Sequence, residues 1–397
     1  MNFRLIGGIL LIIGVSVGAA ILALPIATAP GGFWLTCGLL LTCWLGMTAG
    51  ALLLLEVNLA LPEGSNLISM ARATLGAKGQ IVAWVSYLLL LYSLLSAYIS
   101  GGADVAQGFL HAAQVESPLW VNAFVFTCLL GYIVYRGIRS VDYVNRGLMS
   151  IKTLLYALLL TTLSFFVGDH SLPAGSFLGL LPATTVVLTS FGYAIIIPSL
   201  RCYFHSDAVM LRKVVLIGSA IPLFLYIAWV TLVQAVLPLE GEYGLLKLAG
   251  SSAPITGLSD AIVALTHNNL ASFVIHAFIS VCILTAFLGV SLSLSDFLAD
   301  GLSIKKEGKG NAIVALLTFV PPLVILLITP SIFIAALSYA GIFCVILLML
   351  LPILMAWSAR YSKRLIITQS LPGGRIVLSI LFAVAMCFLG VGIYLSM

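Results

Sequence analysis

The sequence has very little charge. Only 8% of its 397 residues are Asp, Glu, Lys or Arg, and 62% are hydrophobic, whereas an ordinary soluble domain is about 25% charged. A water-soluble protein of this length would need far more polar side chains to cover its surface. The mean hydropathy of +1.20 leads to the same conclusion. The composition therefore predicts a polytopic membrane protein.

Two further absences narrow the class of protein. The net charge of +5 comes from Lys and Arg residues spread along the chain rather than from a basic domain, so we expect no nucleic-acid partner. The cysteines are odd in number and form no CxxC or Cys/His cluster, which indicates neither a disulfide framework nor a metal site. They lie in apolar stretches, at Cys37, Cys43, Cys128, Cys202, Cys282, Cys344 and Cys387. We expect no cofactor and no obligatory protein partner.

Motifs of two rival classes are also missing. The chain has no His-Glu-x-x-His and no paired aspartates at mid-depth of facing spans, so an intramembrane enzyme is not favoured. The charged residues form no ring of the kind that lines a selective channel.

What the chain does have is a series of long apolar runs. A spanning helix needs about 20 mostly apolar residues, and runs of this kind, bounded by charges, Pro and Gly, predict eleven transmembrane helices in an all-α, single-domain protein over 1–397. The expected spans are 5–29, 33–59, 80–107, 118–135, 148–168, 183–203, 212–237, 270–299, 311–329, 331–358 and 374–396. Half-polar helical segments are expected near 67–75, in an inner loop, and 258–266, in an outer loop.

The distribution of basic residues predicts the orientation. With the N-terminus inside, only Lys247 of the 18 Lys and Arg residues falls on the outer side. Cytoplasmic loops carry an excess of Lys and Arg, so this pattern favours a cytoplasmic N-terminus and a periplasmic C-terminus.

Two spans are interrupted in matching places. The first has Gly14 and Gly18 before Pro25, and the sixth has Gly192 before Pro198. Each opens a block of five spans, and an odd block length turns the second block upside down. Paired Gly/Pro-interrupted helices in corresponding positions point to a binding site between inverted repeats. Freed N–H groups and helix N-termini suit a carboxylate, and freed carbonyls suit an ammonium group or a cation.

Around these breaks the sequence resembles a known family, the hydroxy and aromatic amino acid permeases, and within it the bacterial tyrosine- and tryptophan-specific branch. The resemblance spans about 4–395 and rests on Gly14-Val-Ser-Val-Gly18-Ala-Ala-Ile-Leu-Ala-Leu-Pro25, Leu52-Leu-Leu-Leu-Glu56-Val, Ala97-Tyr-Ile-Ser-Gly101, Thr189-Ser-Phe-Gly192-Tyr, Ile197-Pro-Ser199, Phe287-Leu-Gly-Val and Asp296-Phe-Leu-Ala-Asp300. It implies the leucine-transporter-like fold of the amino acid–polyamine–organocation superfamily. In that fold 5–168 and 183–358 would be the inverted five-helix repeats, and 374–396 an added eleventh helix.

The resemblance also implies an activity, which is proton-coupled uptake of an aromatic amino acid, tyrosine first, across the bacterial inner membrane. The substrate's charged groups would meet the unwound backbone of both broken spans. Aromatic or polar residues in the shared motifs are further candidates for the pocket. The substrate-binding set is Val15, Ser16, Val17, Gly18, Ala19, Ala20, Tyr98, Ser100, Ser190, Phe191, Gly192, Tyr193, Phe287 and Tyr339.

One departure affects the substrate. Tyrosine-type members read Ser-Phe-Gly-Phe-His in the sixth span, whereas this chain has Tyr193 and Ala194 in place of the last two residues. Loss of the imidazole removes a donor and adds room, so the preferred aromatic amino acid stays open. A transporter of small or aliphatic amino acids, or one driven by sodium, remains an alternative.

Lys152, in the fifth span, is the candidate coupling residue. Ionisable groups inside a membrane are rare and are functional candidates by default, although a lysine snorkelling to the inner surface is the simpler alternative. Some proton-coupled members of the superfamily carry a lysine at this position in place of a sodium ion. The resemblance would put Lys152 near the carbonyls of Gly14 and Val17, with Thr285 close by. An ammonium there would compete with sodium for one site.

Other ionisable residues have roles nearer the surface. Glu56 either pairs with an inner-loop arginine or relays protons. Asp104 would face the outer vestibule, and Asp296 and Asp300, four residues apart, would form an inner gate with basic loop residues. Of the histidines, His276 is expected to be a satisfied core residue, and the others lie in loops or near span ends, at His111, His170, His205 and His267.

Overall fold

The computed structural model describes residues 3–167, 175–251, 253–329, 332–366 and 370–396, which form helices and their connections without a strand. Nine helical stretches in this part of the chain are long and apolar enough to cross a membrane. The prediction of an all-helical polytopic membrane protein is confirmed. Position 168, which ends the fifth expected span and the first expected repeat, position 331, which begins the tenth span, and His170 lie outside the described residues.

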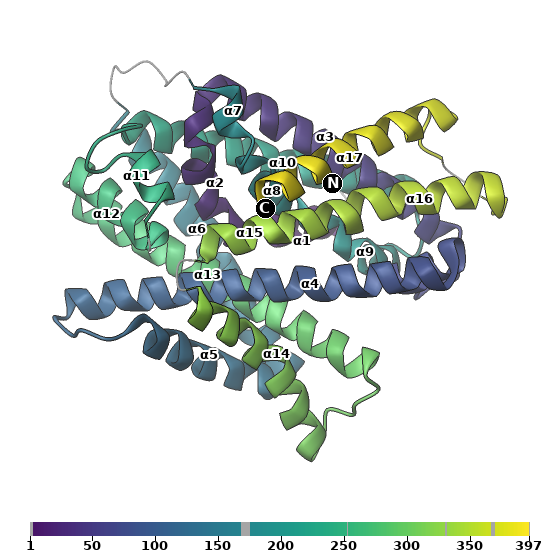
Figure 1. Ribbon diagram of the computed structural model, residues 1–397, viewed down its shortest axis with the longest axis horizontal. Coiled ribbons are helices and arrows are strands. Elements are labelled where there is room, and N and C mark those ends of the chain that lie inside the picture. The colour runs from purple at the N-terminus through teal and green to yellow at the C-terminus, as the bar shows by residue number, and fades with distance from the viewer. Residues whose placement is uncertain (1–2, 168–174, 252, 330–331, 367–369, 397) are drawn as a thin grey trace.

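The first half of the chain contains the helices that carry the first break and its neighbours (Figure 1). They are α1 (Phe3–Ser16), α2 (Ala20–Thr28), η1 (Ala29–Gly31), α3 (Gly32–Leu59), α4 (Leu67–Ala112), α5 (Leu119–Tyr135) and α6 (Ile138–Ser164). Gly76 has φ 76° and interrupts α4, so the expected half-polar segment near 67–75 is a short helix in front of the span.

The second half contains the second break and the outer helices. They are α7 (Phe177–Leu180), α8 (Ala183–Ser190), η2 (Gly192–Ile196), α9 (Ile197–Tyr203), α10 (Ala208–Val236), α11 (Leu245–Ala249), α12 (Pro254–Thr266), α13 (Asn269–Gly301), α14 (Gly308–Ile328), α15 (Phe333–Val345), η3 (Ile346–Leu350), α16 (Leu351–Trp357), η4 (Ser358–Ser362) and α17 (Gly374–Ser396). The expected helix near 258–266 is confirmed as α12, and its place on the outer side stays a prediction.

Nine long stretches differ from eleven expected spans for two physical reasons. The break after Ser16 leaves α1 with 14 residues, and α2, η1 and α3 follow one another as one stretch, Ala20–Leu59. Within that stretch Gly32 has φ 64°, outside the helical region, so the chain can change direction there. The fourth expected span is α5, whose 17 residues fall just short of the usual length. Eleven spans stay a prediction.

Close helix contacts hold the two halves together. α4 packs along α15 and α16, while α13 packs against α6 and α4, and α1 against α10 (Figure 1). Gly341 of α15 comes so close to α8 that a Cβ there would lie 2.0 Å from the Thr185 carbonyl oxygen. Only glycine permits this approach, which fixes α8 and therefore the position of the second break.

Candidate functional site

The first break lies where Gly14–Pro25 predicted it. α1 ends at Ser16 and α2 begins at Ala20, and the amide of Gly18 donates to the carbonyl of Ser16 (2.8 Å) instead of continuing the helical pattern. Val17 and Ala19 are buried here. The unwound residues therefore lie inside the protein, where irregular backbone is tolerated in a membrane protein.

The second break follows the same plan. α8 ends at Ser190, Phe191 leaves the helical conformation, and Gly192–Ile196 form a tighter 3-10 turn before Pro198 opens α9. A Cβ on Gly192 would lie 3.5 Å from the Cys344 sulfur on α15, an ordinary van der Waals distance, so the turn leaves room for a methyl group there.

One tyrosine joins the two breaks. The Tyr226 hydroxyl oxygen, on α10, lies 2.6 Å from the carbonyl oxygen of Ser16 and 2.8 Å from that of Ser190. These carbonyls end α1 and α8, so one hydroxyl bridges the last turns of both broken helices. The Tyr226 ring is fully buried and contacts Phe191 edge-on, with centroids 5.2 Å apart.

A second aromatic donor on α10 reinforces this arrangement. The Trp229 indole nitrogen donates to the carbonyl of Ile21, 3.0 Å away on α2. Sequence reasoning missed both residues, because α10 carries no break and Tyr226 is one of 14 tyrosines with nothing to distinguish it.

Lys152 lies at the first break as well. Its Nζ donates to the Val17 carbonyl oxygen at 2.5 Å, and its side chain is buried, so it does not reach the inner surface. Gly14 faces α6 through Met149, whereas the Thr285 hydroxyl donates to Val281 and Cys282 within its own helix. No described carboxylate forms an ion pair with Lys152.

The members of the expected substrate-binding set differ in burial, and their role stays a prediction. The following members are buried: Ser16, Val17, Ala19, Ala20, Tyr98, Ser100, Ser190, Phe191, Tyr193 and Phe287. Val15 and Tyr339 are 45% and 43% exposed. Phe287 packs against Phe126 of α5 and Phe319 of α14. The Tyr193 hydroxyl donates to Thr48 of α3 at 3.0 Å.

Ser16 has the most unusual environment of these residues. Its hydroxyl oxygen is buried with no hydrogen-bond partner among the described residues. A buried unpaired hydroxyl is costly and is available to a ligand. Gly14–Gly18 also reads Gly-x-Ser-x-Gly, the spacing of a hydrolase nucleophile elbow. That motif needs a strand-to-helix turn and a base beside the serine, and Ser16 has neither in this part of the chain.

Glu56 forms a buried ion pair. Its two carboxylate oxygens accept from the Nε and Nη2 atoms of Arg360 at 2.6 and 2.5 Å, and from the amide of Leu371 at 2.9 Å. The side chains are 1% and 10% exposed. Arg360 lies at the end of the tenth expected span, so this pair ties α3 to η4.

A cavity of about 390 Å³ opens below the second break. Its wall includes Ile195 of η2, Pro198 of α9 and Tyr87 of α4, together with Asp296 and Asp300. Asp296 pairs with Lys306 of the following loop at 2.5 Å. The two expected gate residues thus line the same cavity as residues of the second break.

Three further polar residues lie near the C-terminal end of α4 and the N-terminal end of α13. Asp104, His111 and His276 line a separate, larger cavity. His276 is partly exposed there, and its Nδ1 lies 2.8 Å from the Ser272 carbonyl oxygen. His276 is hydrogen-bonded, as expected, but it lines the cavity instead of lying in the core, and Phe109 of α4 lies beside its ring with centroids 6.4 Å apart. His205 and His267 have positive φ values in loops, as expected.

Two interrupted helices whose last carbonyls lie at one phenol, and an ammonium group on unwound backbone, fit a membrane transporter. The chain belongs to the tryptophan/tyrosine permease family, whose model matches residues 1–391. The resemblance seen in the motifs is confirmed, and the protein is not an enzyme.

Individual relatives agree on amino acid transport. A tyrosine-specific transport system 2 of Haemophilus influenzae is 32% identical over 361 residues, covering 90% of this chain and 88% of the relative. A tryptophan-specific transport protein of Pseudomonas aeruginosa is 30% identical over 363 residues, covering 90% and 86%. A glutamine transporter 2 of Aliivibrio fischeri is 29% identical over 391 residues, covering 96% and 97%.

Proposed function

We propose that the protein is a proton-coupled symporter that imports an aromatic amino acid, tyrosine first, across the bacterial inner membrane by alternating access. The N-terminus would be cytoplasmic and the C-terminus periplasmic. The single observation that carries the proposal is the contact of the buried Lys152 ammonium with the Val17 carbonyl at the first break.

The helix contacts support inverted repeats. If 5–168 and 183–358 are related by a pseudo-two-fold axis, α4 corresponds to α13 and α6 to α15. The packing of α4 on α15 then mirrors the packing of α13 on α6, and both pairs are in close contact. A leucine-transporter-like fold with α17 as the added helix explains these pairings.

The breaks supply the groups that an amino acid needs. Carbonyls at Ser16 and Ser190 suit the substrate ammonium, and the amides that begin α2 suit its carboxylate. Ser16 Oγ, which has no partner among the described residues, would bind one of these groups. Phe191 and Tyr98 are buried nearby and suit an apolar ring.

Lys152 supports protons rather than sodium as the driving ion. A lysine can bind and release a proton, and a low-dielectric site disfavours its charged form. A sodium ion would need the Val17 carbonyl that Lys152 already occupies. Asp296 and Asp300 would control the cavity on the inner side.

Glutamine is a second candidate substrate, because the glutamine transporter of Aliivibrio fischeri aligns with more of this chain than the tyrosine and tryptophan relatives above. Tyrosine-type members have a histidine where this chain has Ala194, so a polar group that they have is missing here.

Uptake into proteoliposomes tests the proposal. Radiolabelled tyrosine should accumulate under an inward proton gradient without sodium, and unlabelled tryptophan or phenylalanine should compete better than serine or leucine. Preferential competition by glutamine would replace the substrate assignment. A requirement for sodium would contradict the proton coupling.

A further inference from the structure

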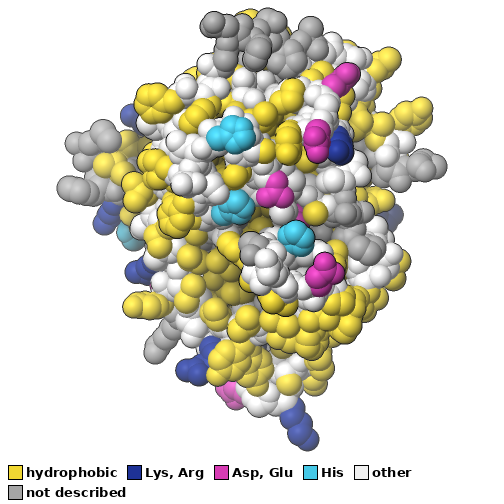
Figure 2. Space-filling model, turned by 90° about the vertical axis from the view of Figure 1, so that its left-hand side faces the viewer, with side chains coloured by type: hydrophobic (Ala, Val, Ile, Leu, Met, Phe, Trp, Pro, Cys, Tyr) yellow, Lys and Arg dark blue, Asp and Glu magenta, His cyan; other side chains and the backbone are white. Residues whose placement is uncertain are grey.

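The largest cavity among those described above is not at the breaks. It measures about 790 Å³ and lies between the end of α4, the start of α13 and the short helix α12, within the range of about 300–1,000 Å³ that small-molecule sites occupy. Figure 2 shows that His and acidic side chains gather among apolar ones on this side of the molecule. The cavity shares no residue with either break.

Asp104 connects two of the helices that surround the cavity. Its carboxylate accepts from the amides of Ile255 (3.1 Å) and Thr256 (3.3 Å) and from the Thr256 hydroxyl, so it caps the first turn of α12 from another helix. This charge is fully used by the cap. Asp104 therefore fixes α12 on α4 and holds the wall of the cavity in place.

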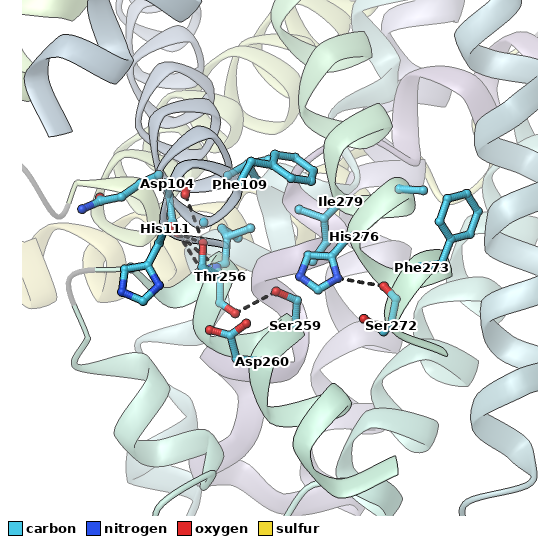
Figure 3. A pocket seen from close by; sticks show the side chains of 16 residues that line it. Asp104, Phe109, His111, Thr256, Ser259, Asp260, Ser272, Phe273, His276 and Ile279 are labelled. Carbon is cyan, nitrogen blue, oxygen red and sulfur yellow. Dashed lines mark hydrogen bonds between the residues drawn. The ribbon is translucent and has the colours of Figure 1, made fainter. Parts of the chain in front are cut away.

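A second carboxylate in the cavity is not used in this way. Asp260, one turn further along α12, lies between the rings of His111 and His276 in Figure 3. No described residue forms an ion pair with it. Partial burial raises the pKa of the Asp260 carboxyl, and the two nearby imidazoles act in the opposite direction.

The rest of the wall is apolar and aromatic. Phe109 and Phe273 lie on α4 and α13, and both are more than half exposed. An exposed phenyl ring at a cavity rim packs against apolar groups and can also face a cation. The site thus combines a carboxylate, two imidazole rings and two aromatic rings.

We propose that this cavity binds an organic zwitterion with an apolar body. Asp260 holds the primary ammonium, and the Nε2 atom of His276, whose Nδ1 proton points to Ser272, also accepts from it. The His111 ring donates to the adjacent anionic group, and Phe109 and Phe273 enclose the apolar part. This chemistry has two sources at a membrane, a free aromatic amino acid or the headgroup of an aminophospholipid. The inference rests on the proposed function only in taking tyrosine as the probe.

Counting bound tyrosine tests the proposal. Full-length protein in nanodiscs of phosphatidylcholine is titrated with radiolabelled tyrosine, and we expect two molecules per chain. Asp260→Asn should bind one tyrosine per chain, because its affinity for the second tyrosine should be lowered about tenfold or more. Glu242→Gln is the matched control, because Glu242 is an exposed carboxylate outside the cavity, and it should bind two.

Further experiments distinguish the two possible ligands, and they distinguish a failure of the second site from a failure of the transport proposal. If phosphatidylethanolamine in the nanodisc removes one of the two tyrosines from the wild type, the headgroup is the resident zwitterion. One tyrosine in both lipids, unchanged in Asp260→Asn, overturns the second site and leaves the transport proposal standing. If tyrosine does not bind at all, the substrate proposal fails, and the same count with glutamine decides the second site.

Discussion

Lys152 donates to the carbonyl oxygen of Val17 at 2.5 Å, which places the ammonium group of α6 on the residue where the first broken helix unwinds. The two residues are separated by 135 positions in the sequence. Any change in the charge of Lys152 therefore acts directly on the backbone that is expected to hold the substrate.

Replacing Lys152 with Met should abolish coupling. Without an ammonium to gain and lose a proton, gradient-driven accumulation of tyrosine in proteoliposomes should fall about tenfold or more, equivalent to at least about 1.4 kcal/mol, while exchange of tyrosine persists. Lys152→Arg should also fail to accumulate tyrosine, because a guanidinium does not release its proton. Lys213→Met, at an exposed position on α10, is the control. Full accumulation by Lys152→Met would refute the assignment.

Tyr226→Phe should remove the hydroxyl contact shared by the two breaks. The change keeps the ring against Phe191 but removes the hydroxyl that reaches the Ser16 and Ser190 carbonyls. Leaving these buried groups unpaired should cost about 1–3 kcal/mol of stability and raise the KM for uptake several-fold.

Tyr92→Phe is the matched control for this substitution. Its hydroxyl donates to the Leu317 carbonyl at 2.7 Å, a contact between α4 and α14 that involves no residue of either break. Thermal unfolding should show a loss in both variants, whereas uptake kinetics should change only in Tyr226→Phe. Equal effects on KM would mean that the Tyr226 hydroxyl is an ordinary packing contact.

Glu56→Gln should destabilise the protein strongly. It leaves the largely buried Arg360 guanidinium without its partner, which typically costs about 3–5 kcal/mol. Replacing both residues, as in Glu56→Leu with Arg360→Met, should recover most of that loss in a chemical or thermal unfolding experiment. Asp142→Asn, which breaks an exposed pair with Arg146, should change stability by no more than about 1 kcal/mol.

The same double variant tests a role of Glu56 in proton transfer. If the pair is structural, the folded double variant should still take up tyrosine in response to a proton gradient. A stable variant that binds tyrosine but has lost the gradient response would instead favour the relay.

Binding in the cavity between α4, α12 and α13 should depend on pH through Asp260. The ammonium of the ligand needs the ionised carboxylate, and partial burial raises the Asp260 pKa. Binding should therefore be lost as pH falls, at a higher pH than for an ordinary exposed carboxyl. The second tyrosine, counted from neutral to acidic pH, should dissociate first.

The surroundings of Asp260 define the control for this experiment. His276 faces it from α13, and Asp104 and His111 from α4. Lys247 is the one charged residue of α11, and α2 has none. Asp260→Asn should bind weakly at every pH, whereas Glu242→Gln should keep the wild-type profile. If Asp260→Asn shows the same pH profile as the wild type, one of the other groups is responsible for the titration.

The sequence by itself determined the properties that depend on neighbouring residues. Runs of apolar residues predict spanning helices because each backbone group is satisfied within its own helix. The breaks at Ser16 and Ser190 follow from Gly and Pro close by in the chain, and a lysine inside an apolar run is conspicuous without a structure. The family could be recognised from the same segments.

Only the tertiary structure decided which groups meet across the fold. Tyr226 and Ser16 are 210 positions apart, and Arg360 and Glu56 are 304 apart. No local pattern encodes such pairs, because they depend on how helices pack and on which face each one turns inward. For the same reason the sequence analysis overlooked Tyr226. A buried carbonyl takes whichever donor the packing brings within hydrogen-bond distance.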